Sequence, residues 1–113
     1  MSSLSPMTAW ILLLVAGCLE VVWVLSMKVS QGFTRHGYTA LTFAAAGASF
    51  WLLGMALKTL PVGTAYAVWT GVGALGAAVL GIWWFNEPSN LLRLLSIGLI
   101  VLGIVGLKLS SLS

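Results

Sequence analysis

One carboxylate of this chain lies where a charge is costly. Glu20 falls inside an apolar run that extends from about residue 7 to residue 27, and no Lys or Arg precedes Lys28. Because burial in an apolar environment destabilises the ionised form, such a group can take up a proton or be neutralised by a bound cation. Both cannot occupy one carboxylate together, so Glu20 predicts exchange of a proton for a cationic substrate. The alternative is a protonated Glu20 that only hydrogen-bonds a neighbouring helix.

Aromatic and hydroxyl side chains recur at helical spacing in the apolar runs. Trp23 follows Glu20 by three residues and therefore shares its helix face, and Tyr66 and Trp69 share a face in the same way. Aromatic rings attract cations, so Trp23 and Trp69 either line a cation site or simply pack. Ser49 could donate a hydrogen bond to Glu20 or bond back to its own helix.

Glycines are the remaining functional signal. Gly71 and Gly73 weaken helix propensity in the middle of an apolar run, which makes this segment a candidate bend for a helix that changes shape. Gly98 and Gly103 alternate with Leu and Ile in the last apolar run, which is typical of a seam between two copies of a helix. Small residues that serve only close packing would give the same pattern.

Composition places these residues in a membrane. Of the 113 residues, 60% are hydrophobic and 6% are charged, against roughly 25% charged residues in soluble domains. A single His and a single Cys predict neither a metal site nor an enzyme, and no cofactor is expected beyond protons as the coupling ion. Because the Lys and Arg residues are scattered, no nucleic-acid partner is expected either.

A helix needs about 20 residues to cross the hydrocarbon core. Four runs of suitable length are bounded by charged or turn residues, and they predict an all-α integral membrane protein with one domain over residues 1–113. The predicted helices cover residues 7–27, 38–57, 62–85 and 91–109. Trp10, Trp83 and Trp84 lie near the ends of these runs, as interfacial tryptophans do.

The basic residues give little orientation to this bundle. Short loops make successive helices antiparallel, which places the first and third loops on one side of the membrane and the second loop with both termini on the other. The cations then divide into Lys28, Arg35 and Arg93 against Lys58, Lys108 and the terminal amine. Since a Lys/Arg excess normally fixes orientation, this balance favours insertion both ways up and antiparallel pairing, unless other features resolve the weak bias.

Three segments make the chain resemble the small multidrug resistance family along nearly its whole length. They are Gly17-Cys-Leu-Glu20-Val-Val-Trp23, the run from Lys58-Thr-Leu-Pro61 through Tyr66-Ala-Val-Trp69-Thr-Gly-Val-Gly73, and Gly98-Leu-Ile-Val-Leu-Gly103. The resemblance implies an antiparallel, dual-topology homodimer in a bacterial inner membrane, with fourth helices at the dimer contact. It also implies a site shared by both Glu20 residues and lined by Tyr66 and Trp69, with the third-helix bend at Gly71-Val72-Gly73.

Two features resemble the guanidinium-exporter subtype, namely Trp23 and the sequence Thr-Leu-Pro-Val-Gly-Thr-Ala-Tyr. A third segment resembles the multidrug branch instead, namely Ser49-Phe50-Trp51-Leu52-Leu53. Guanidinium is a planar set of donors that can bind carboxylates in bidentate fashion and stack on rings, so the paired Glu20 side chains, Trp23 and Trp69 suit it. Ser49 and Tyr66 would hold the carboxylates. The expected function is therefore proton-coupled export of guanidinium and small substituted guanidinium cations by alternating access. The alternatives are a broad quaternary-ammonium drug exporter and a membrane packing subunit that transports nothing.

Overall fold

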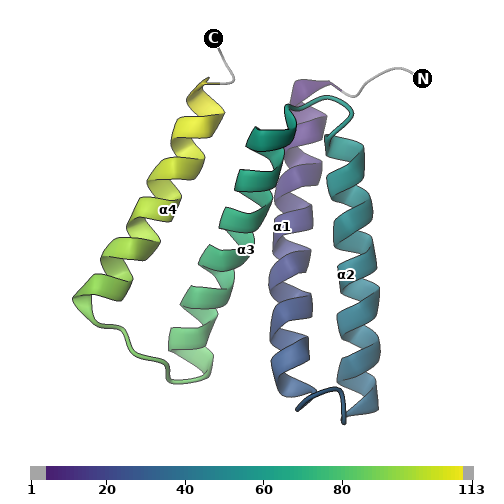
Figure 1. Ribbon diagram of the computed structural model, residues 1–113, viewed down its shortest axis with the longest axis vertical. Helices are drawn as coiled ribbons and strands as arrows, with labels where there is room; N and C mark the ends of the chain where they lie inside the picture. The colour runs from purple at the N-terminus through teal and green to yellow at the C-terminus, as the bar shows by residue number, and fades with distance from the viewer. Residues whose placement is uncertain (1–4, 111–113) are drawn as a thin grey trace.

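Four helices lie side by side in a flat bundle in a computed structural model that describes residues 5–110 (Figure 1). Each is long and apolar enough to cross a membrane, and together they make an all-α architecture. They are α1 (Pro6–Val29), α2 (His36–Ala56), α3 (Val62–Trp84) and α4 (Leu91–Ser110). The predicted spans differ from these bounds by at most two residues at any end. Loops 1 and 3 lie at one end of the molecule, and loop 2 lies at the other with both chain ends (Figure 1).

Local sequence explains where α1 begins and ends. The Ser5 hydroxyl accepts a hydrogen bond from the Thr8 amide at 3.2 Å, and Pro6 occupies the first turn, where no backbone donor is needed. At the other end, the buried Ser30 hydroxyl donates to the Met27 carbonyl at 2.6 Å and accepts from the Phe33 amide at 3.0 Å. Loop 1 therefore has a fixed turn although it is short.

The core lies where α1 packs against both α2 and α3. Leu13 and Val68 are fully buried there, and small residues let the backbones approach closely. A Cβ added to Gly17 would lie 2.7 Å from the Cβ of Val72, and one added to Gly76 would overlap Val21. The α1–α3 contact thus depends on glycine on each helix.

Trp10 is the one interfacial tryptophan that the sequence placed wrongly. Its side chain is 6% exposed and belongs to the core cluster, whereas Trp83 and Trp84 are 77% and 67% exposed. The Lys108 ammonium lies over the Trp10 ring, 5.0 Å from its centroid. Contacts within the core cluster, rather than proximity to the end of a run, determine the position of Trp10.

Helix α4 is attached to the rest of the bundle along one edge. It packs against α3, and none of its residues is buried. Partly buried Ile104 and Leu107 face the core cluster, and Gly71 lies against the side chain of Ile104. The opposite face of α4 is exposed and apolar, with large side chains at Leu95, Leu99, Leu102 and Val105.

Loop 3 fixes the connection between α3 and α4 with polar contacts. Arg93 Nη2 donates to the Glu87 carboxylate at 2.6 Å, and the Glu87 amide donates to the Gly81 carbonyl at 3.1 Å. The Asn90 side chain accepts from the Arg93 amide at 2.9 Å and so caps the first turn of α4. The second acidic residue of the chain therefore serves the loop and not the interior of a span.

Candidate functional site

Glu20 lies on α1 at its contact with α3, where glycine makes room for the carboxyl group. A Cβ added to Gly73 would overlap the Glu20 carboxylate and would lie 2.8 Å from its Cγ. Gly73 itself is buried in α3. A side chain at this position would therefore displace the carboxyl group, so the position of Glu20 depends on the absence of a side chain at Gly73.

Gly71 and Gly73 differ in what they face. Gly71 faces α4, where an added Cβ would lie 3.1 Å from Ile104 Cδ1, whereas Gly73 faces Glu20. Helix α3 continues without interruption through this segment. The bend predicted at these glycines stays a prediction. Each glycine also makes room for a side chain of a neighbouring helix, Ile104 at Gly71 and Glu20 at Gly73.

Ser49 joins α2 to both neighbouring helices and makes no hydrogen bond to Glu20. Its fully buried hydroxyl donates to the Ala16 carbonyl on α1 at 2.6 Å and accepts from the Trp69 indole N–H on α3 at 2.9 Å. The prediction that Ser49 bonds Glu20 or its own helix was therefore wrong in both forms. A hydroxyl can donate only one hydrogen bond, and here its acceptor is the Ala16 carbonyl of α1.

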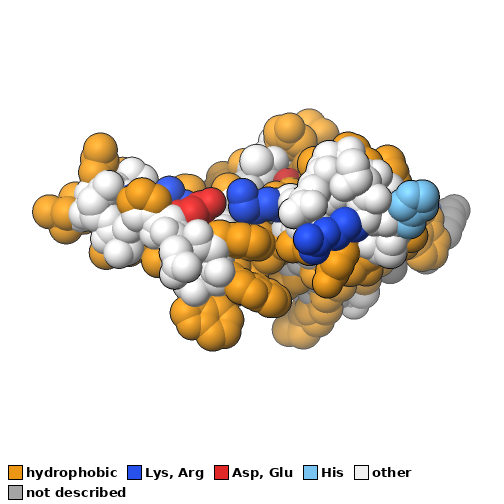
Figure 2. Space-filling model, turned by 90° about the horizontal axis from the view of Figure 1, so that it is seen from below, with side chains coloured by type: hydrophobic (Ala, Val, Ile, Leu, Met, Phe, Trp, Pro, Cys, Tyr) orange, Lys and Arg blue, Asp and Glu red, His pale blue; other side chains and the backbone are white. Residues whose placement is uncertain are grey.

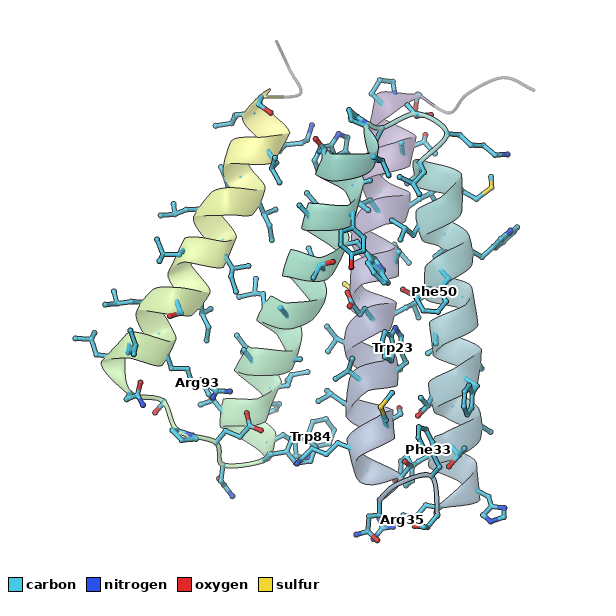
Figure 3. All side chains as sticks on the ribbon, viewed as in Figure 1. Trp23, Phe33, Arg35, Phe50, Trp84 and Arg93 are labelled. Carbon is cyan, nitrogen blue, oxygen red and sulfur yellow. The ribbon has the colours of Figure 1, made fainter. Side chains whose placement is uncertain are left out.

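Four aromatic rings cross the bundle beside the carboxylate. Trp23 on α1 lies 6.2 Å from Phe50 on α2, Phe50 lies 5.8 Å from Trp69 on α3, and Trp69 lies 5.8 Å from Tyr66, all between ring centroids. Trp23 and Phe50 are seen side by side between α1 and α2 (Figure 3). The structure thus brings together three predicted site aromatics through Phe50.

Sequence reasoning used Phe50 only as a subtype marker and missed its place in this row. The signal was available in part, because Phe50 directly follows Ser49 in a run of large apolar residues. Tyr66 is at the other extreme: its side chain is 58% exposed, and its hydroxyl has no hydrogen-bond partner among the described residues. Tyr66 does not hold the Glu20 carboxylate within one copy of the chain.

Two polar atoms at the site are buried and unpartnered within the described part of the chain. They are Glu20 Oε1, which is an acceptor when ionised, and Trp23 Nε1, which is a donor. Buried polar groups without partners are uncommon in native structures and call for an explanation, such as a ligand or an ion. The site therefore offers a carboxylate and aromatic faces to a cation with N–H donors.

Replacing Ser49 by alanine should destabilise the bundle by about 1–3 kcal/mol, because the buried Trp69 indole N–H would lose its acceptor. The free energy of unfolding, measured by denaturant titration in mixed micelles, checks this. The matched control is Ser96→Ala, since the exposed Ser96 hydroxyl only donates to the Leu92 carbonyl of its own helix, and a loss below about 0.5 kcal/mol is expected there. Equal losses in the two variants would contradict the role given to Ser49.

Comparison with known proteins gives one family over most of the chain. Residues 8–100 match the family model described as Small Multidrug Resistance protein. A guanidinium exporter of Yersinia pseudotuberculosis is 54% identical over 103 residues, which cover 91% of this chain and 99% of that protein. Guanidinium exporters of Citrobacter freundii and Salmonella typhimurium are each 56% identical over 103 residues, with 91% of this chain and 98% of the relative covered.

Proposed function

The chain belongs to the small multidrug resistance family, and on that premise we propose that it exports guanidinium and small substituted guanidinium cations in exchange for protons. Membership makes it a multi-pass protein of the bacterial inner membrane and a transporter, not an enzyme. The substrate proposal draws on relatives that are guanidinium exporters over nearly the same length.

The observation that carries the proposal is an unpartnered carboxylate oxygen beside aromatic rings. Glu20 Oε1 is buried without a donor among the described residues, and Trp23 lies one helical turn away on the same face. A planar guanidinium supplies N–H donors to the carboxylate and a flat surface to the indole ring. A proton satisfies the same oxygen, so loading of one expels the other and couples the two fluxes.

Two copies of the chain in antiparallel orientation would complete the site. The face of α4 that is turned away from α3 is apolar and exposed, and Cβ atoms added to Gly98 or Gly103 would meet open space. Such a face supports close packing of α4 against α4 of a second copy. In that dimer each copy contributes one Glu20, and exchange of the two copies' roles opens the site alternately to each side of the membrane.

Currents on solid-supported membranes test the substrate class. Proteoliposomes should give transport currents with guanidinium and methylguanidinium, and currents at least about tenfold smaller with a bulky quaternary ammonium, because a site built to hydrogen-bond its ligand rejects one without donors. Larger currents with the quaternary ammonium would favour the drug-exporter alternative. No current with any of these cations would support a non-transporting membrane subunit instead.

A further inference from the structure

Two adjoining cavities of different chemistry lie at the end of the bundle that carries loops 1 and 3. The larger has a volume of about 350 Å³ and apolar walls from three helices, including Val22 and Leu25 on α1, Leu41 on α2, and Leu80 on α3. The smaller, of about 240 Å³, includes Lys28, Glu87 and Arg93. Leu25 and Phe85 line both cavities, so the two share a wall.

The apolar cavity runs along α1 from the loop 1 end of the bundle toward its middle. Its α1 lining runs from Val21 to Val29, next to the end of that helix, and at 1.5 Å per residue this is a depth of about 12 Å. The exposed ring of Trp84 stands at its outer edge, near the turn that follows α3 (Figure 3). A cavity of this shape suits a hydrocarbon chain that enters from the headgroup level.

The smaller cavity has more positive than negative charge. Glu87 is already bound by Arg93 at 2.6 Å. The exposed Lys28 has no carboxylate within ion-pair distance among the described residues, and its ammonium lies 5.4 Å from the centroid of the Phe85 ring. Arg93 Nε is buried and has no acceptor within residues 5–110. Figure 2 looks onto this end and shows basic side chains close to an acidic one on a surface rich in hydrophobic atoms.

We propose that these cavities together bind one anionic phospholipid, with an acyl chain in the apolar cavity and the phosphate at Lys28 and Arg93. Glu20 lines neither cavity, and the excess positive charge disfavours a cationic substrate there, so this site is distinct from the one at Glu20. A zwitterionic lipid would bring its own cation to Lys28, and a small soluble anion would leave the apolar cavity unused. The anionic lipid alone matches both halves.

Native mass spectrometry of the full chain in detergent tests the headgroup half. With the same oleoyl chains, phosphatidylglycerol should bind at least about fivefold more tightly than phosphatidylcholine, and Lys28→Gln should remove most of this preference, because one lysine at an anionic surface adds about that factor. Lys58→Gln is the matched control, since Lys58 is also an exposed lysine but lies at the opposite end of the bundle. The Lys58→Gln variant should keep the full preference for phosphatidylglycerol over phosphatidylcholine.

A second pair of variants tests the acyl-chain half. Leu41 lines the apolar cavity, so Leu41→Trp should weaken binding of both lipids about tenfold by displacing roughly two methylene groups. Leu14→Trp changes a leucine of similar exposure that lines neither cavity, and it should have no effect.

Three results would overturn the proposal. Equal binding of the two lipids would remove the charge argument and would fit a cavity covered by a second copy of the chain. An equal effect of Lys28→Gln and Lys58→Gln would show that the attraction is not local. Displacement of the lipid by millimolar glycerol phosphate would identify a soluble anion as the ligand.

Discussion

Guanidinium-evoked currents should disappear when Glu20 is replaced by glutamine, while the four-helix fold and the assembly of the protein stay intact. Glutamine has nearly the same shape, but its amide cannot be ionised and cannot form the bidentate pair of hydrogen bonds between opposite charges that a carboxylate forms with guanidinium. Loss of two such hydrogen bonds, at about 1.5–3 kcal/mol each, weakens guanidinium binding by a factor of roughly 100 or more. Solid-supported-membrane currents measure transport, and size-exclusion chromatography in detergent measures assembly.

Glu87→Gln is the matched control for this experiment. It makes the same chemical change at the only other acidic residue, which lies in loop 3 and is bound by Arg93. Guanidinium currents should persist in this variant. Proton-coupled transport by Glu20→Gln, or its loss in both variants, would contradict the assignment of the coupling carboxylate.

Gly73→Ala is expected to reduce guanidinium affinity by about tenfold or more with little loss of stability. The added methyl group would overlap the Glu20 carboxylate, which is the flexible end of a side chain and can swing aside. The carboxyl group therefore moves, and a displacement of about 1 Å in a binding constellation is enough to cost a large part of its function. Isothermal titration of guanidinium into the detergent-purified protein gives the affinity, and thermal unfolding gives the stability.

The control for this substitution is Gly63→Ala on the same helix, where an added Cβ meets nothing within 4 Å. Alanine should improve helix propensity there by at most about 1 kcal/mol and leave guanidinium binding unchanged. If Gly73→Ala bound guanidinium as tightly as Gly63→Ala, the position of Glu20 would not depend on the absence of a side chain at residue 73.

Much of the architecture follows from length and hydropathy, because lipid requires each spanning segment to satisfy its own backbone. For the same reason the spans at 7–27 and 62–85 could be read from the sequence to within two residues of the helices. The Glu20–Trp23 and Tyr66–Trp69 pairs also depend only on helical spacing. The two residues of each pair share a helix face because of their spacing alone, so a single sequence is enough to predict that they lie close together.

The contacts between helices could not be predicted in the same way. Phe50 bridges Trp23 and Trp69 only because of how α2 is rotated about its axis, and Ser49 reaches the Ala16 carbonyl only because of how far α1 is shifted along α2. Rotation and shift depend on packing across all three helices. The prediction that Trp10 is interfacial was wrong for the same reason, since its burial reflects neighbours that are distant in sequence.

The loose attachment of α4 has a consequence for how the protein is made. Translation delivers α1, α2 and α3 first, and these three already contain all the buried side chains that form the core cluster, apart from the loop residue Leu60. The earlier helices therefore need not wait for the last one before they pack. Helix α4 enters the bilayer with its backbone satisfied and one apolar face still uncommitted, so the order of synthesis leaves the choice of its neighbour to the final step of biogenesis.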